Sequence, residues 1–393
     1  MQHLAVCALM VMAAGCESLR AGRCASHGPA VVTTTQGKVA GIMEKSTKGK
    51  SFWSYYGIPY AKPPIGQLRL RDPLPAEPWG GLRNGSEVSQ PCLQVPFFVA
   101  VAGIRLPPQQ LVGTEDCLYL NVFTPTQLTS IKELPVMVFI PGGGFFAGGN
   151  LEYLPHVLLN HDIILVVLQY RLGILGFLST EDYIVPGNLG LKDQTLALQW
   201  VQNNIHSFGG DPNSVTIFGE SAGGASVHYH ILSPKSRGTR SGSGEKEWSI
   251  TPLPLGPRVD GDFIPAHPAL LIRDHQYNPV DILTGTTAHE GLLVGYPLFG
   301  QTNLQESLLK NFSYVGPLSL MCCDGSTDPL TITQRVYTYY LGGLNFSLET
   351  QKDQIIRSRD FLSSLPTVQN FILFPDKVTS ASSRSLPPPQ VYY

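Results

Sequence analysis

The sequence predicts an α/β fold, and three observations support the prediction. Continuous apolar runs at residues 134–140 and 162–168 are typical of strands that are buried on both faces. A helix-like segment, residues 189–206, comes after them. The strand-like residues 214–218 then lead through a tight turn into the helix-compatible residues 222–232. Buried strands that alternate with helices indicate a mostly parallel sheet.

The composition is that of a globular protein with a sizeable core. Of the 393 residues, 43% are apolar and only 14% are charged, so disorder is not indicated. This length suffices for one large domain or two ordinary ones. The net charge is −2 and no basic patch stands out, so the sequence does not predict a nucleic-acid partner.

The first part of the chain predicts short strands. Residues 31–35 and 38–42 are strand-like and are separated by a Gln-Gly turn at positions 36–37. A proline-containing loop follows at residues 57–64. Residues 114–123 then enter a strand with alternating apolar side chains.

The later part of the chain predicts a helix, a linker and further elements. The helix at residues 189–206 has an apolar stripe and is stopped by Gly209 and Gly210. Residues 239–246 are polar and rich in glycine, which is typical of a linker. The apolar stripe consists of Leu196, Leu198, Trp200, Val201 and Ile205. The elements expected beyond the linker are a buried strand at residues 280–285 and helical segments near residues 335–340 and 353–361.

The N-terminus resembles a secretory signal peptide, which we expect to occupy residues 1–22. The apolar run at residues 4–14 is followed by small residues, as in such signals, although no Lys or Arg precedes it. The run is too short to span a bilayer, so stable membrane insertion is not expected. An Ala-Ala-Gly-Cys sequence at residues 13–16 leaves a lipoprotein cleavage site as the alternative. The sequence therefore predicts a protein that is secreted or resides in the ER lumen.

A possible disulfide and three glycosylation acceptor sequences are consistent with a secreted or ER protein. Cys92 and Cys117 would close a loop of a size that disulfides commonly tie. No Cys-x-x-Cys pair is present, so neither a zinc site nor thioredoxin chemistry is supported, and no metal is expected. Asn84, Asn311 and Asn345 each begin an Asn-x-Ser acceptor sequence for glycosylation.

A G-x-S-x-G sequence, Gly219-Glu220-Ser221-Ala222-Gly223, lies between the predicted strand and helix. This is the context of a nucleophile elbow, because a turn this sharp needs backbone angles and close approaches that a Cβ would block. Ser221 would then stand above the edge of the sheet as a nucleophile. The alternative is an ordinary glycine-containing turn between a strand and a helix.

A serine nucleophile also needs a general base, a group that orients the base, and donors for the developing oxyanion. Gly142, Gly143 and Gly144 follow the predicted strand that ends at Ile140. Such a run lets several N–H groups point at one spot, and the N–H of Ala222 would add another donor. The alternatives are a flexible loop or a phosphate cradle, but the Gly-Lys-Ser/Thr ending of a phosphate loop is absent.

Taken in order, the motifs resemble the carboxylesterase/cholinesterase family, the type-B carboxylesterases among the α/β-hydrolases. The resemblance covers residues 31–238, resumes at residues 259–291, and matches the family's early disulfide with Cys92 and Cys117. It implies an α/β-hydrolase fold with a mostly parallel central sheet and helices on both faces. It also implies a small-molecule carboxylic ester substrate and no cofactor. Besides the elbow, the shared motifs are Glu115-Asp-Cys-Leu-Tyr-Leu-Asn121, Gly142-Gly-Gly-Phe145, Gly187-Asn-Leu-Gly-Leu-Lys-Asp-Gln194, Phe208-Gly-Gly-Asp-Pro212 and Val259-Asp-Gly-Asp-Phe-Ile-Pro265.

The resemblance implies roles for single residues. Ser221 is the nucleophile, and the amides of Gly143, Gly144 and Ala222 form the oxyanion hole. Pro141 stands where the family usually has His or an aromatic residue. Because the glycine amides do the binding, we expect this departure to be tolerated.

The resemblance places the triad acid at Glu290, which comes after Ser221 in chain order, as in the α/β-hydrolases. Without the resemblance, a lone Glu before Gly would be interpreted as a surface or helix-terminal residue. In this fold the histidine follows the acid, but none of the ten histidines lies after Glu290. We therefore assign no catalytic histidine. Residues 390–393 are similar to the start of the strand that precedes the family's histidine loop.

Residues 29–393 are thus predicted to form one hydrolase domain that is incomplete in two places. Near residues 238–247 the family has several tens more residues, including the strand after the elbow helix, and at its C-terminus the chain stops short of the histidine loop. A sheet without an interior strand leaves backbone groups of its neighbours unpaired. Either the linker closes the gap by an unusual route, or the chain is a fragmentary or alternatively spliced product.

The sequence as a whole predicts a serine carboxylic ester hydrolase that transfers an acyl group to water through a seryl acyl-enzyme. Because no histidine follows Glu290, we expect this chain to be weakly active or inactive. Two alternatives stay open. One is a catalytically inactive, cholinesterase-like binding or adhesion protein, and the other is an incomplete splice or gene product. The sequence defines neither the substrate nor the oligomeric state.

Overall fold

The structure, a computed structural model, describes residues 30–96, 111–125, 133–182, 184–236, 256–280, 282, 310–319 and 328–341. The predicted strand at 280–285 is described only at Val280 and Ile282, which are exposed and lie in no strand. The following predicted features lie outside the described residues: the signal peptide at 1–22, the linker at 239–246, Glu290, Asn345 and the helix at 353–361.

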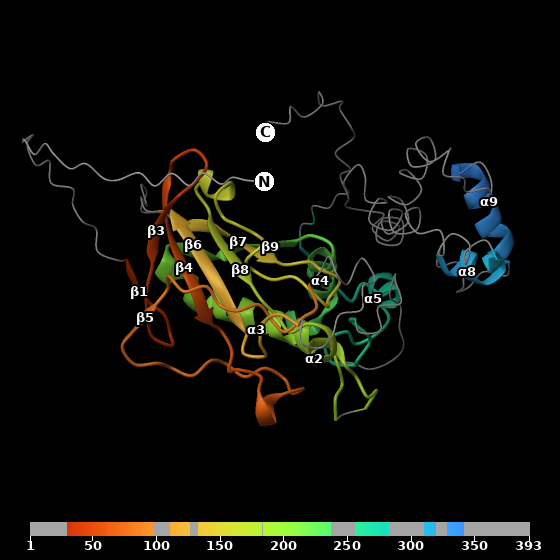
Figure 1. Cartoon of the computed structure of the whole chain (residues 1–393), viewed down its shortest axis with the longest axis horizontal. Helices are drawn as coiled ribbons and strands as arrows, with labels where there is room; N and C mark the ends of the chain where they lie inside the picture. Colours follow the sequence, from red (N-terminus) through yellow and green to blue (C-terminus); the bar gives the residue numbers. More distant parts are fainter. Residues whose placement is uncertain are drawn as a thin grey trace, which may run out of the picture.

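A small sheet is formed by the first part of the chain (Figure 1). β1 (Val31–Thr33) and β2 (Lys38–Ala40) pair as an antiparallel hairpin, and β5 (Leu82–Asn84) lies parallel to β2. The turn is closed by a hydrogen bond of 2.9 Å from the N–H of Thr34 to the carbonyl of Gly37. The predicted hairpin is therefore confirmed, with shorter strands than expected.

A six-stranded sheet forms the centre of the fold, in the order β3-β4-β6-β8-β7-β9. The strands are β3 (Ile42–Lys45), β4 (Ser51–Pro59), β6 (Tyr119–Pro125), β7 (Leu134–Ile140), β8 (Ile164–Leu168) and β9 (Gly210–Gly219). β8, β7 and β9 run parallel, whereas β3, β4, β6 and β8 pair antiparallel. The strands predicted between residues 114 and 218 are confirmed, but the described sheet is mixed rather than mostly parallel. A short turn between β3 and β4 permits only antiparallel pairing, while a long crossover through a helix brings β9 parallel to β7.

β9 is an edge strand in the described part of the chain, where it pairs with β7 alone. Its apolar side chains Val215, Ile217 and Phe218 are only half-buried, although Val138 on the neighbouring β7 is fully buried. The predicted loss of an interior strand would leave this edge bare.

Two long helices flank β9 (Figure 1). α3 (Leu189–Asn204) passes into a 3-10 turn, Ile205–Phe208, and ends at Gly209, whose left-handed conformation (φ 85°) favours glycine. α4 (Ala222–Leu232) begins directly after the elbow, over the residues predicted for it. Before residue 280 the structure also describes α2 (Gly173–Phe177), α5 (Pro268–Arg273) and the 3-10 turns Gly66–Leu68, Leu158–Asn160 and Pro234–Ser236.

Two further helices lie in the later part of the chain. α8 (Phe312–Ser319) packs against α9 (Pro329–Leu341) through Phe312 and Tyr337, whose ring centroids lie 5.1 Å apart. α9 confirms the helix predicted near residues 335–340. Among the helices that the structure describes, none is long and apolar enough to cross a bilayer.

The two faces of the central sheet bury different clusters. On one face Val138 packs in a cluster with Trp200 of α3 and Ala225 of α4. On the other face Phe139 packs with Leu159, in the loop between β7 and β8. Helices were expected on both faces, but in the described residues α3 and α4 share one face. The β7–β8 loop crosses the second face with a single 3-10 turn.

Candidate active site

The turn between β9 and α4 has the geometry of a nucleophile elbow. Ser221 stands between the two elements with φ 55° and ψ −123°, a conformation that a residue with a side chain rarely adopts. Gly219 is required beside it, because an added Cβ would lie 2.5 Å from the carbonyl carbon of Gly223. The helix starts with a hydrogen bond of 2.9 Å from the N–H of Ala225 to the carbonyl of Ser221. The sequence prediction of a sharp strand–turn–helix is confirmed.

The side chain of Ser221 is open to solvent. The residue is exposed, and its Oγ makes no hydrogen bond to any residue within the described ranges. Glu220 beside it is exposed as well. A ligand can therefore reach this hydroxyl in the described part of the molecule.

The glycine loop after β7 lies against the elbow. A Cβ added to Gly142 would come within 3.2 Å of the Cβ of Ser221 and within 2.5 Å of the carbonyl oxygen of Glu220. Gly143 (φ 109°) and Gly144 (φ 63°) have the positive φ angles that favour glycine. The structure thus brings the predicted loop and the predicted nucleophile together.

Three backbone amides near Ser221 are available as donors. Within the described ranges, the N–H groups of Gly143, Gly144 and Ala222 donate to no backbone carbonyl in a turn or loop. Ala222 is the first residue of α4, where N–H groups have no partner inside the helix and the helix dipole favours negative charge. These amides can donate hydrogen bonds to a developing oxyanion, as the sequence predicts.

Two tyrosines that the sequence analysis missed support this arrangement. The buried hydroxyl of Tyr170 donates to the carbonyl of Pro141 over 2.8 Å and so holds the start of the glycine loop. Tyr153 donates to Oε2 of Glu220 over 3.2 Å. Burial, and then the charge of Glu220, raises the pKa of Tyr153 to about 12, so this hydroxyl keeps its proton at neutral pH. Neither tyrosine lies in a local pattern that could have marked it.

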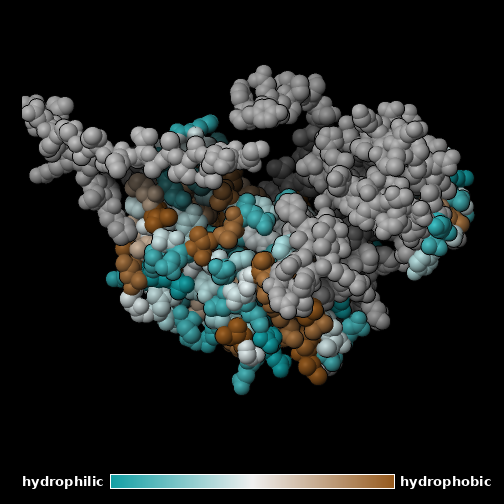
Figure 2. All heavy atoms as spheres, viewed as in Figure 1, coloured by the Kyte–Doolittle hydropathy of each residue, from teal (hydrophilic) through white to brown (hydrophobic). Residues whose placement is uncertain are grey.

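Exposed leucines lie next to Tyr153 in the sequence. Leu151 is 43% exposed and Leu154 is 65% exposed, and they flank Tyr153, which contacts Glu220. Figure 2 shows hydrophobic residues interspersed with hydrophilic ones over the described surface. Exposed apolar side chains in such a position can contact the apolar part of a bound ligand.

His230 of α4 occupies a structural position. His230 is buried, with Nε2 2.9 Å from Oε1 of Gln194 and Nδ1 2.7 Å from Oγ of Ser236. Burial lowers the pKa of His230 to about 4, so the ring is neutral at pH 7. The predicted acid, Glu290, lies outside the described residues, so its role as the triad acid stays a prediction.

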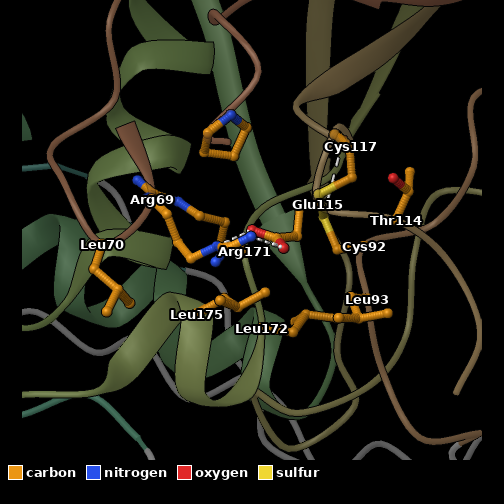
Figure 3. Close-up of a pocket in the computed structure, with 11 residues that line it drawn as sticks. Arg69, Leu70, Cys92, Leu93, Thr114, Glu115, Cys117, Arg171, Leu172 and Leu175 are labelled. Carbon is orange, nitrogen blue, oxygen red and sulfur yellow. Dashed lines mark hydrogen bonds and ion pairs between the residues drawn. A yellow bond between two sulfur atoms is a disulfide. The ribbon is translucent and has the colours of Figure 1, made fainter. Parts of the chain in front are cut away.

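A pocket beside the disulfide is distinct from the elbow (Figure 3). Cys92 and Cys117 form the predicted disulfide, with their Cα atoms 4.9 Å apart. The pocket is small and is lined by the pair formed by Arg69 and Glu115, which are joined by two hydrogen bonds of 2.6 Å. Ser221 and the glycine loop do not line it. Among the described residues, no group of three or more His, Cys, Asp or Glu side chains could hold a metal ion.

Comparison with known proteins identifies the family. The profile of the carboxylesterase family matches residues 28–252 and 243–384, two segments that overlap at residues 243–252. The chain belongs to the carboxylesterase family. The predicted resemblance is thereby confirmed over most of the chain.

Individual carboxylesterases match parts of the chain. Juvenile hormone esterase of Tribolium castaneum is 46% identical over 237 residues, which are 58% of this chain and 39% of that protein. Carboxylesterase 1E of Mus musculus is 45% identical over 240 residues, or 59% of this chain and 42% of that protein. A carboxylic ester hydrolase of Bombus ignitus is 33% identical over 371 residues, or 79% of this chain and 66% of that protein. The chain spans about two-fifths of the length of the first relatives it matches.

The fold is shared with a solved carboxylesterase structure. Juvenile hormone esterase from Manduca sexta matches with a TM-score of 0.69 at 24% identity, over 87% of this chain and 75% of that chain. The predicted α/β-hydrolase fold is therefore confirmed.

Proposed function

We propose that the chain is a serine carboxylic ester hydrolase with Ser221 as its nucleophile. The observation that supports this most directly is the backbone of Ser221, held at φ 55° and ψ −123° between β9 and α4. A serine in this conformation presents its Oγ outside both elements, here beside the loop of residues 142–144.

In the proposed reaction Ser221 Oγ attacks the carbonyl carbon of a small-molecule ester, and its proton passes to a general base. The amides of Gly143, Gly144 and Ala222 donate to the oxyanion of the tetrahedral intermediate, which collapses as the alcohol leaves with that proton. Water then hydrolyses the acyl-enzyme and releases the carboxylic acid. Glu290 would orient the base, and the scheme needs no metal or organic cofactor.

No general base for Ser221 is assigned among the residues of this sequence. No histidine lies after Glu290 in the sequence, and His230 is committed to Gln194 and Ser236. Loss of one triad member in a serine hydrolase costs on the order of 10⁴- to 10⁶-fold in rate. We propose that the chain alone reacts with activated esters slowly, through the oxyanion amides and the exposed serine.

Fluorophosphonate labelling with peptide mapping, together with p-nitrophenyl acetate turnover, tests this function. We expect labelling at Ser221 that Ser221→Ala abolishes, and turnover far below that of the Bombus ignitus relative assayed in parallel. Turnover equal to that relative and lost in Ser221→Ala would refute the slow-reaction proposal. A cooperatively folded chain without label at Ser221 would refute the nucleophile and favour the inactive binding protein.

We further propose that the protein is secreted or resides in the ER lumen and is glycosylated. Asn84 is exposed, and its Oδ1 accepts from the hydroxyl of Ser86 over 2.8 Å, within the acceptor sequence. Asn311 is exposed too. Expression in a secreting cell line should yield a product in the medium or ER whose mass falls on glycosidase treatment, with smaller shifts in Asn84→Gln and Asn311→Gln. A cytosolic product of unmodified mass would contradict the proposal.

A further inference from the structure

A series of hydrogen bonds runs from the 3-10 turn after α4 to the elbow, and only its member Ser236 is exposed. His230 Nδ1 lies 2.7 Å from Oγ of Ser236, and His230 Nε2 lies 2.9 Å from Oε1 of Gln194 on α3. Gln194 Nε2 donates to Ser226 Oγ over 3.1 Å, and Ser226 Oγ donates to the carbonyl of Ala222 over 2.9 Å. Gln194 and Ser226 are completely buried, and His230 is 2% exposed.

Donor and acceptor counting fixes the direction of this series. The carbonyl of Ala222 can only accept, so the one hydroxyl proton of Ser226 is committed to it. Ser226 must then accept from the amide nitrogen of Gln194, which turns the Gln194 oxygen toward His230. His230 therefore carries its proton on Nε2, and its Nδ1 accepts from the hydroxyl of Ser236. If the direction of one of these hydrogen bonds were reversed, a buried polar atom would be left without a partner. The direction of the whole series is therefore fixed.

The far end of the series is also held in place. The ring of Phe263 packs edge-on against His230 with centroids 5.4 Å apart, and Asn278 Nδ2 donates to the His230 carbonyl over 3.0 Å. Both residues belong to the segment after the predicted linker. Lys192 of α3 and Lys235 each pair with Asp262 of that segment, at 2.9 Å and 2.7 Å. These contacts hold His230 in place, and with it the far end of the hydrogen-bond series.

The near end of the series is the residue that supplies a proposed oxyanion donor. Ala222 is the first residue of α4, and its carbonyl is tied to Ser226, one turn further along. The same turn is held from the other side by Gly223, which packs on the carbonyl of Ile140 at the end of β7. The orientation of Ala222 therefore depends on two fixed contacts, one to the sheet and one to Gln194 through Ser226.

We propose that Gln194, Ser226 and His230 are positioning residues that hold the first turn of α4 so that the N–H of Ala222 faces the oxyanion. None of the three touches the substrate. The catalytic consequence rests on the proposed function, whereas the ordering of the helix turn does not.

Two disruptive variants, one conservative variant and one control variant test the proposal. Ser226→Ala removes the final hydrogen bond, and Gln194→Glu gives a carboxylate that can accept from His230 but cannot donate to Ser226. Thr124→Val is the matched control, because Thr124 is buried on β6 and its hydroxyl donates to the carbonyl of Phe208 over 3.0 Å. Ser226→Thr keeps the hydroxyl and is the conservative variant. The readouts are the rate of fluorophosphonate labelling at Ser221, taken well below each melting temperature, and hydrogen exchange of amides 222–226.

We expect labelling to slow roughly tenfold in Ser226→Ala and Gln194→Glu, less than for removal of an oxyanion donor itself. Exchange of amides 222–226 should speed up in the same two variants. Thr124→Val should lose stability without either change, and Ser226→Thr should restore the labelling rate. Labelling and exchange that match Thr124→Val in all variants would overturn the proposal. If the wild type is not labelled at Ser221, the proposed function fails, and the exchange rates still decide the positioning role.

Discussion

A Cβ added to Gly223 would lie 2.0 Å from the carbonyl oxygen of Ile140, because the first turn of α4 packs directly on the end of β7. The neighbouring Gly224 has room, since its added Cβ would come no closer than 3.4 Å to another atom. Two adjacent glycines of one helix therefore differ in whether they can accept a side chain.

Gly223→Ala should displace the elbow. We expect it to lower the free energy of unfolding by about 2 kcal/mol or more, as overpacking of a tight contact does, and to abolish labelling of Ser221. Gly224→Ala should leave labelling intact and raise stability by up to about 1 kcal/mol, because alanine favours a helix over glycine. Denaturant unfolding and labelling measure both variants. If the two behave alike, the close contact with Ile140 does not shape the elbow.

Near the carboxyl end of β8, Arg171 and Asp193 form a buried ion pair, and we expect its loss to lower the free energy of unfolding strongly. Asp193 of α3 accepts from Arg171 at Nε (2.8 Å) and at a terminal nitrogen (2.7 Å), and the two side chains are 0% and 3% exposed. Asp193→Asn leaves a buried guanidinium uncompensated, so we expect a loss of about 3–5 kcal/mol in unfolding free energy. Asp162→Asn, which breaks a solvent-exposed pair with Lys50, should cost less than about 1 kcal/mol. A comparable loss in both variants would contradict this difference.

Acid should destabilise the fold through His230. Burial lowers the pKa of His230 from 6.5 to about 4, so the unfolded chain takes up this proton first as the pH falls. The neutral ring contributes about 3 kcal/mol to the free energy of unfolding. This contribution is fully present above pH 6.5 and is lost as the pH falls to about 4. Burial lowers the pKa of His228 too, which adds in the same direction.

Melting temperatures measured from pH 7 to pH 4.5 check this dependence. His230→Gln cannot titrate, so its melting temperature should fall less with acidification than that of the wild type. His206→Gln, at an exposed position, is the control and should follow the wild type. Parallel curves for His230→Gln and the wild type would show that this ring does not set the pH dependence.

The disulfide should contribute measurably to stability. Cys92 and Cys117 are 25 residues apart, and closing a loop of this size stabilises a fold by about 3 kcal/mol in the loop-entropy estimate. We expect dithiothreitol to lower the melting temperature of the wild type and to leave the Cys92→Ala/Cys117→Ala variant unchanged. A variant that melts like the oxidised wild type would contradict the estimate.

By itself, the sequence determined the family, the elbow and most of the elements. Residues 214–218 and 222–232 could be assigned because strand and helix periodicity are local properties of the chain. The glycines around Ser221 could be assigned because a sharp turn demands them wherever it occurs. The disulfide followed from the family's motif order rather than from geometry.

Only the tertiary structure decided which distant groups meet. Tyr170 bonds to the carbonyl of Pro141, 29 residues away, and Gln194 bonds to Ser226, 32 residues away, and no local pattern marks either contact. Burial of a polar side chain such as Gln194 contradicts the amphipathic pattern of α3, and it is stable only because partners on α4 satisfy it. The mixed sheet and the shared face of α3 and α4 likewise follow from how strands and crossovers pack. The sequence placed a serine at the elbow, and tertiary packing determined what holds that elbow in place.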